Sequence, residues 1–292
     1  MEGIITDSKT NTVSFSSLIT RFRVWKGLKL VLKKKNIKYS FIDGTKDIWV
    51  RDFMPVQITE SRYTQFYYKP SYLDDKPEYL TDYYCYSRYG NYLGASFCKD
   101  LKVDGGNIIK CDDCVIMTEK VFSENSEKSR KEIMSTLEEL IGCEILIIPH
   151  DSEEETGHAD GMLRYIGNNT ILLNHYYDFD KPLRKKLLNV LTPHFNVAEL
   201  HLDTDRYLAT SWAYINYLQV GNHVIVPAVN KRLDEMAIKQ LEAYLHLEID
   251  SVPALGIVRL GGGLNCASWT RWDGLLWANE QIKNHIDIHS EY

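Results

Sequence analysis

The sequence predicts a mixed α/β protein in which five small units close into a ring within one domain, residues 1–292. Two observations support this fold class. An order of strand, strand, helix and strand recurs with a period of about 53 residues, which fits the chain about five times. Polar residues suited to catalysis recur at the same period, so equivalent positions of the units are expected to converge on one axis.

The repeat is read from short apolar runs and longer amphipathic stretches. Three full copies are expected, with elements at 107–110, 115–118, 126–141 and 144–148; at 162–166, 170–174, 181–191 and 197–202; and at 213–218, 223–227, 233–244 and 249–252. The N-terminal part adds a strand at 12–15, a helix at 22–34 and a strand at 39–42. The Tyr-rich stretch from Tyr67 to Tyr92 is irregular and predicts a long excursion or lid.

Composition limits the classes of function. The chain is 44% hydrophobic and 25% charged, with a formal net charge of -6 and a pI near 5.9, which is typical of a globular protein. Nucleic acid and anionic membranes are not expected as partners, because both require a basic surface. The first ten residues do not show the basic region followed by an apolar region that is typical of a secretory signal peptide. A cytoplasmic location is therefore expected.

Six cysteines are scattered without the density of a disulfide scaffold, so reduced thiols are expected. The pair in Cys111-Asp112-Asp113-Cys114 has metal-ligand spacing, yet it lies between two β-rich runs separated by a polar dipeptide. Structural zinc would need a second Cys/His pair, and none follows nearby. The stretch therefore predicts a hairpin, with zinc or redox chemistry as the alternatives.

Four polar positions keep the period of the repeat. Asp52 follows WVR, Asp104 opens DGGN, His158 lies in GHAD, and Cys266 ends GGGLNC. Successive members are about 53 residues apart, except that His158 and Cys266 are separated by twice this interval. The position missing between them falls beside YINY at 214–217. A lone His or Cys is usually a packing residue, but the shared register predicts one common pocket. The glycine run before Cys266 is typical of tight backbone geometry beside a ligand.

Five short motifs follow one another along the chain, namely WVRDFMP at 49–55, DGGN at 104–107, ETGHAD at 155–160, YINY at 214–217 and GGGLNC at 261–266. In this order they resemble the motifs of the agmatine deiminase and bacterial-type peptidylarginine deiminase family, which belongs to the guanidine-modifying penteins. The resemblance implies a five-bladed α/β propeller that hydrolyses a guanidino group to a ureido product and ammonia.

By position, the resemblance implies that Cys266 is the amidino-cysteine nucleophile and His158 the acid/base. Asp52 and Asp160 would hold the guanidinium, and Asp160 would also belong to the catalytic residues. Asp104, which stands where the family usually has Glu, would be a further substrate-binding carboxylate. Two departures concern the nucleophile. Asn265 replaces the family's usual His, and residues 267–270 lack the usual Ile-Thr-Gln-Gln.

Neighbouring residues carry weaker predictions. Trp49 either stacks on a bound cation or belongs to the core. Asn216 is a candidate to orient the substrate, whereas Arg51 is expected to pair with a carboxylate. His150, His175 and His223 are not predicted to be catalytic.

The chemistry explains why these residue types belong together. A guanidinium is planar and presents hydrogen-bond donors in a fixed fork, which carboxylates accept in pairs. A cysteine becomes a strong nucleophile if His158 or the bound cation itself favours its thiolate. Histidine then protonates the leaving amine and activates water. These steps need no metal or other cofactor.

Several alternatives stay open. An amidinotransferase would use the same residues to pass the amidino group to an amine, and a peptidylarginine deiminase would act on a protein side chain. A catalytically silent binding module would not need the thiol and imidazole pair. The expected partner is a small cationic guanidino compound, with agmatine as the first candidate, and a homo-oligomer is neither predicted nor excluded.

Overall fold

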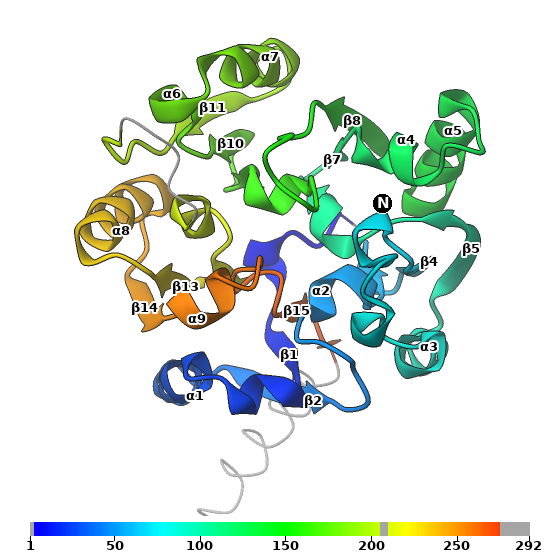
Figure 1. Cartoon of the computed structure of the whole chain (residues 1–292), viewed down its shortest axis with the longest axis horizontal. Coiled ribbons are helices and arrows are strands. Elements are labelled where there is room, and N and C mark those ends of the chain that lie inside the picture. Colours follow the sequence, from blue (N-terminus) through cyan, green and yellow to red (C-terminus); the bar gives the residue numbers. More distant parts are fainter. Residues whose placement is uncertain (1–2, 205–209, 275–292) are drawn as a thin grey trace, which may run out of the picture.

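The computed structural model describes residues 3–204 and 210–274, which form five three-stranded sheets around a common centre (Figure 1). In each sheet the central strand pairs antiparallel with one neighbour and parallel with the other. The long helices lie at the outer rim of the ring. The predicted five-bladed α/β propeller is thereby confirmed.

The strands follow the repeat read from the sequence. In chain order the sheets contain β1 (Thr12–Ser16), β2 (Lys38–Ile42) and β15 (Trp269–Arg271); β3 (Val56–Gln57), β4 (Tyr63–Tyr67) and β5 (Ser96–Lys102); β6 (Ile109–Lys110), β7 (Cys114–Thr118) and β8 (Glu144–Ile148); β9 (Leu163–Tyr165), β10 (Thr170–Leu173) and β11 (Asn196–Glu199); and β12 (Leu218–Val220), β13 (His223–Ala228) and β14 (Ile249–Pro253).

Each parallel pair is joined by a crossover helix, as parallel strands require. These helices are α1 (Val24–Lys34), α3 (Tyr83–Tyr92), α5 (Arg130–Ile141), α7 (Lys181–Leu191) and α8 (Lys231–Leu245). Shorter helices are α2 (Val50–Phe53), α4 (Lys120–Glu124), α6 (Tyr176–Phe179) and α9 (Leu255–Val258). Within the described ranges, no helix is long and apolar enough to cross a membrane.

The α5 helix shows how local sequence sets these elements. Ser129 caps its first turn, because the Ser129 side chain accepts a hydrogen bond from the Glu132 amide and Glu132 bonds back to the Ser129 amide. Ile133, Leu137 and Ile141 then recur every fourth residue and are fully buried against the sheet.

The ring closes through its first and last strands. The β1 strand is parallel to β2 and antiparallel to β15, with Val13 opposite Thr270. The sheet of the first unit is therefore completed from the C-terminal side of the chain. We infer from this closure that the five units act as one domain.

The predicted strands at 107–110 and 213–218 were partly wrong. Residues Gly105–Asn107 and Ser211–Tyr214 form 3₁₀ turns, and the strands begin only at Ile109 and Leu218. A continuous buried apolar run does not distinguish a strand from a turn by its periodicity. Corresponding helical turns precede β3 and β9, so a turn stands before the inner strand in four of the described units.

The Tyr-rich stretch divides into two parts. Tyr83–Tyr92 is the crossover helix α3 of the second unit, whereas Ser71–Leu73 and Pro77–Tyr79 are short 3₁₀ turns. Only the segment with the two 3₁₀ turns corresponds to the predicted excursion. It reaches the central cavity through Tyr72, Leu73, Lys76 and Tyr79.

A buried group of charges ties the N-terminal turn to the ring. Asp7 forms an ion pair with Arg164, whose side chain is almost fully buried and also donates to the Tyr217 carbonyl oxygen at 3.2 Å. Burial alone would raise the pKa of Asp7, but attraction by Arg164, Arg51 and Lys110 lowers it below its ordinary value.

We predict that Asp7→Asn destabilises the protein by about 3 kcal/mol, because it leaves the buried Arg164 charge without its partner. Folding lowers the pKa of Asp7, so its contribution is present above the pKa of the unfolded chain and is lost as the pH falls through the folded pKa. Urea unfolding at neutral and acidic pH measures this. Glu248→Gln, which removes only a surface ion pair with Lys35, should change little. Equal stability of both variants would contradict the prediction.

Candidate active site

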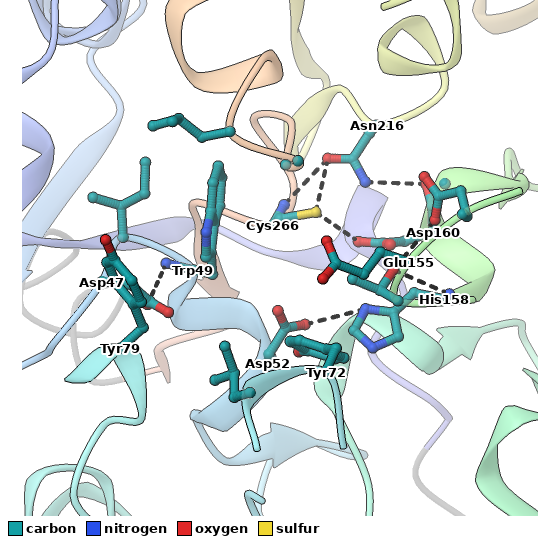
Figure 2. A pocket seen from close by; sticks show the side chains of 18 of the residues that line it. Asp47, Trp49, Asp52, Tyr72, Tyr79, Glu155, His158, Asp160, Asn216 and Cys266 are labelled. Carbon is teal, nitrogen blue, oxygen red and sulfur yellow. Dashed lines mark hydrogen bonds and ion pairs between the residues drawn. The ribbon is translucent and has the colours of Figure 1, made fainter. Parts of the chain in front are cut away.

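A cavity of about 740 Å³ lies at the centre of the ring. Figure 2 shows Trp49, Asp52, His158 and Cys266 around this space. Six of the seven site residues predicted from the sequence line it, namely Trp49, Asp52, His158, Asp160, Asn216 and Cys266. They come from turns of different units, which converge as the register of the repeat predicted.

The glycine run shapes the wall beside the predicted nucleophile. A Cβ atom at Gly262 would collide with the Trp49 ring, and one at Gly263 would collide with the Asn216 side chain. The run therefore lets the backbone approach both side chains directly. Trp49 is only partly buried and exposes part of its ring to the cavity, where it is placed to stack on a cation.

Cys266 lies among polar groups. Its Sγ atom is 3.3 Å from Asn216 Oδ1 and 3.5 Å from Asp160 Oδ2, and its amide donates to Asn216 Oδ1 at 3.2 Å. Burial raises the pKa of the Cys266 thiol well above its ordinary value, and the charges of Asp160 and Asp52 raise it further. Cys266 is therefore a thiol at neutral pH, and a bound cation would favour the thiolate.

His158 is enclosed by carboxylates. Its Nε2 atom is 2.9 Å from Asp104 Oδ2, and its Nδ1 atom is 3.7 Å from Asp52 Oδ1. Burial would lower the pKa of His158, but the charge of Asp52, the hydrogen bond with Asp104 and the charge of Asp160 together raise it to about 10. The imidazole consequently carries a proton at neutral pH and is ready to act as an acid.

Two buried aspartates face the cavity from different units. Asp52 Oδ1 accepts the Gly106 amide at 3.0 Å. Burial raises the pKa of this carboxyl group, but the facing charge of His158 opposes the shift and favours the carboxylate. Asp160 Oδ2 accepts the side-chain amide of Asn265 at 2.7 Å. Asn265, which replaces the family's usual His, thus holds a carboxylate beside the sulfur of Cys266.

Asp104 is not among the described residues that line the cavity, where the predicted contact with the substrate would place it. It lies behind His158, where its Oδ2 atom also accepts the Tyr72 hydroxyl at 3.2 Å. We infer that Asp104 positions the imidazole and raises its basicity, and does not itself contact the substrate.

Glu154 lines the cavity but was not singled out in the sequence. Burial raises the pKa of its carboxyl group to about 7, and the nearby charge of Asp160 adds to this. Glu154 belongs to the acidic run at 153–155, and such runs usually form a solvated surface, so its chemistry was not recognised. Its place shortly before GHAD is the signal that could have indicated it.

Arg51 connects two parts of the site. Its amide donates to the Cys266 carbonyl oxygen at 3.1 Å, and its Nε atom donates to the Asn265 carbonyl oxygen at 2.9 Å. We expected Arg51 to pair with a carboxylate. Its side chain bonds to that carbonyl and to the Thr270 hydroxyl at 3.2 Å, while its charge also attracts the carboxylate of Asp7. Because Arg51 adjoins Asp52, it holds the nucleophile loop at a set position beside that carboxylate.

Two further observations bear on the predictions. Among the described residues, no group of three or more His, Cys, Asp or Glu side chains is arranged to hold a metal ion. His150, His175 and His223 are outside the described residues that line the cavity.

Comparisons with known proteins place this geometry in a wider group. A model of the Porphyromonas-type peptidyl-arginine deiminase family matches residues 19–271. An agmatine deiminase structure from C. jejuni has a TM-score of 0.76 at 20% identity, over 94% of this chain and 97% of that chain. A DDAH structure from Pseudomonas aeruginosa, complexed with citrulline, has a TM-score of 0.59 at 15% identity, over 89% and 99% of the two chains. These two likenesses concern the fold.

A curated sequence relative also matches. It is named "Putative agmatine deiminase", comes from Mycoplasma mycoides subsp. mycoides SC, and is 25% identical over 205 residues. The matched part covers 57% of this chain and 56% of the length of that protein.

We predict that Asp160→Asn makes Cys266 more reactive toward iodoacetamide while reducing turnover of guanidino compounds. Loss of the Asp160 charge lowers the pKa of the thiol, and one pKa unit increases the thiolate fraction about tenfold. Turnover falls because a carboxylate facing the cation is lost. Peptide mapping after timed alkylation at neutral pH measures the rate at Cys266. Asp100→Asn, on the exposed face of β5, is the control, and slower alkylation of Asp160→Asn would contradict the assignment.

Proposed function

The chain belongs to the Porphyromonas-type peptidyl-arginine deiminase family, and on that premise we propose that it hydrolyses the guanidino group of a small cationic substrate. The products would be a ureido compound and ammonia. The observation that carries this proposal is the meeting of Cys266, protonated His158 and the carboxylates of Asp52 and Asp160 in one cavity.

Binding begins with charge and shape. Asp52 and Asp160 approach the cavity from different units, and Cys266 lies beside Asp160. A guanidinium between the two carboxylates would donate paired hydrogen bonds to each, and its flat face would lie against the Trp49 ring. This pose leaves its central carbon near the Cys266 sulfur.

The bound cation would activate the nucleophile. Burial and the charges of Asp160 and Asp52 disfavour the Cys266 thiolate. A guanidinium compensates these negative charges, so the thiol releases its proton to solvent as the substrate binds. The thiolate then attacks the guanidinium carbon, which gives a tetrahedral adduct.

His158 would act first as an acid and then as a base. Its Nδ1 atom faces Asp52 at the cavity, whereas Nε2 is held by Asp104, so Nδ1 is the proton donor to the leaving amine. Departure of ammonia leaves an amidino group on Cys266. Neutral His158 then takes a proton from water, which attacks the amidino carbon and expels the thiolate.

The charge of the cavity supports a substrate without a carboxylate. Its lining carries six carboxyl groups, which outnumber its three Lys or Arg side chains together with the protonated His158, and Lys76 is paired with Glu155 at 2.8 Å. Agmatine, with a guanidinium and a primary ammonium, suits this surplus of negative charge. The partly buried carboxyl group of Glu154 is a candidate partner for the second cation.

The excursion supports a small substrate over a protein side chain. Tyr72, Leu73, Lys76 and Tyr79 line the cavity, and the ion pair from Lys76 to Glu155 joins the excursion to the loop before His158. A folded protein presenting arginine would have to displace this segment, whereas a small free amine would fit within the cavity.

We predict that kcat/KM for agmatine is at least about tenfold higher than for free arginine or an arginine-containing peptide. The acidic lining repels the carboxylate of arginine and does not accommodate the flanking residues of a peptide. Ammonia release in the absence of any acceptor amine measures this. Addition of EDTA should leave the rate unchanged, because no proposed step needs a Lewis acid. Faster citrullination of a protein would favour a peptidylarginine deiminase, and a requirement for an acceptor amine would favour an amidinotransferase.

We also predict that Cys266→Ala folds and binds agmatine but has no turnover, because the carboxylates that hold the cation remain. His158→Ala should lose at least ~10²-fold in kcat through the missing acid/base. Acid quenching of the wild-type enzyme during turnover, followed by peptide mapping, should locate an added amidino group on Cys266. An active Cys266→Ala enzyme would remove the proposed mechanism, and absence of turnover in the wild type with every guanidine would favour a binding module.

A further inference from the structure

Two neighbouring cysteines, Cys111 and Cys114, lie outside the described cavity lining and take no part in the proposed catalysis. Cys111 and Cys114 flank the two-residue turn that joins β6 to the antiparallel strand β7. The Cys111 amide donates to the Cys114 carbonyl oxygen at 2.9 Å, which closes the turn and confirms the predicted hairpin. Turns of this kind bring their first and fourth Cα atoms within ~7 Å, a separation that overlaps the range found in disulfides.

Both side chains lie on the same side of the hairpin. Cys111 is fully buried in the apolar core formed around β9 and β10, and Cys114 packs against that same core from its edge. Their thiols are hydrogen-bonded to each other. The two thiols therefore face each other at the closed end of the hairpin, and both are reduced.

The two thiols differ in access and acidity. Cys114 is partly exposed, whereas Cys111 has no exposed surface. The hydrogen bond from Cys111 lowers the pKa of the Cys114 thiol, while the same bond and burial raise the pKa of Cys111. Cys114 is thus the thiol that meets a reagent first, and Cys111 is placed to react second.

We propose that Cys111 and Cys114 form a redox-active dithiol that is converted to an intramolecular disulfide by a small-molecule disulfide such as oxidised glutathione. Neither cysteine lines the catalytic cavity. The site is therefore separate from the proposed deiminase chemistry and does not depend on it.

The exchange balances in two steps. The Cys114 thiolate attacks one sulfur of the glutathione disulfide, forming a mixed disulfide and releasing one glutathione thiolate, which takes a proton from solvent. Cys111 then loses its proton to solvent and attacks the Cys114 sulfur, which expels the second glutathione. The dithiol is oxidised by two electrons, and one glutathione disulfide becomes two glutathione thiols.

The test uses the whole protein in buffers of graded reduced-to-oxidised glutathione ratio, with acid quenching, alkylation of free thiols and tryptic mapping. Cleavage after Lys110 and Lys120 releases Cys111 and Cys114 in one peptide without another cysteine. We expect this peptide to lose both alkylatable thiols together and to become lighter by two hydrogen atoms. Excess reduced glutathione should restore both thiols.

Single variants separate the two roles. Cys111→Ser should stop at a glutathione adduct on Cys114, whereas Cys114→Ser should leave Cys111 as a free thiol. Cys143→Ser is the matched control and should behave like the wild type, although Cys143 lies near Cys114. The proposal is overturned if the wild-type peptide keeps two free thiols in fully oxidised glutathione, ends as a stable adduct, or is linked to Cys143.

Discussion

The antiparallel pairing of β15 with β1 closes the ring, and the central cavity depends on that closure. Val13 lies opposite Thr270 in this pair, so the segment just after Cys266 is anchored to the first strand of the chain. The Arg51 bonds to the Cys266 and Asn265 carbonyl oxygens then hold the Cys266 loop beside Asp52. A repeat left open at this sheet would have the same residues but no common pocket for them.

Charge is distributed unevenly around this centre. The cavity gathers carboxyl groups, whereas the buried Arg164 and the partly buried Arg51 and Lys110 lie near Asp7 and outside the described cavity lining. Burial, followed by repulsion from Arg51 and Arg164, lowers the pKa of Lys110 to about 8, while Asp7 opposes this shift. The surplus of carboxyl groups in the cavity suits the proposed cationic ligand, which would offset the charges that disfavour the Cys266 thiolate.

Some residues of the site could be recognised from the sequence, and others could not. Asp52, Asp104, His158 and Cys266 stood at a common period, and a ring brings such positions together. Glu154 had no such signal, because an acidic run usually indicates a solvated face. The strand predicted at 213–218 was partly a turn, since a buried apolar run has the same pattern in both conformations. Asn216 lies in that stretch and reaches the Cys266 amide and sulfur from it.

The sequence by itself determined the repeat, the outer helices and the residue types of the site. These features depend on apolar periodicity and on motifs that span a few residues. Only the tertiary structure decided which carboxyl group serves which partner. Asp104 and Asp52 were both candidates to bind the guanidinium, yet Asp104 lies behind His158 and Asp52 faces the cavity. The direction of each side chain follows from how the turns of different units meet at the axis, and no local pattern contains that information.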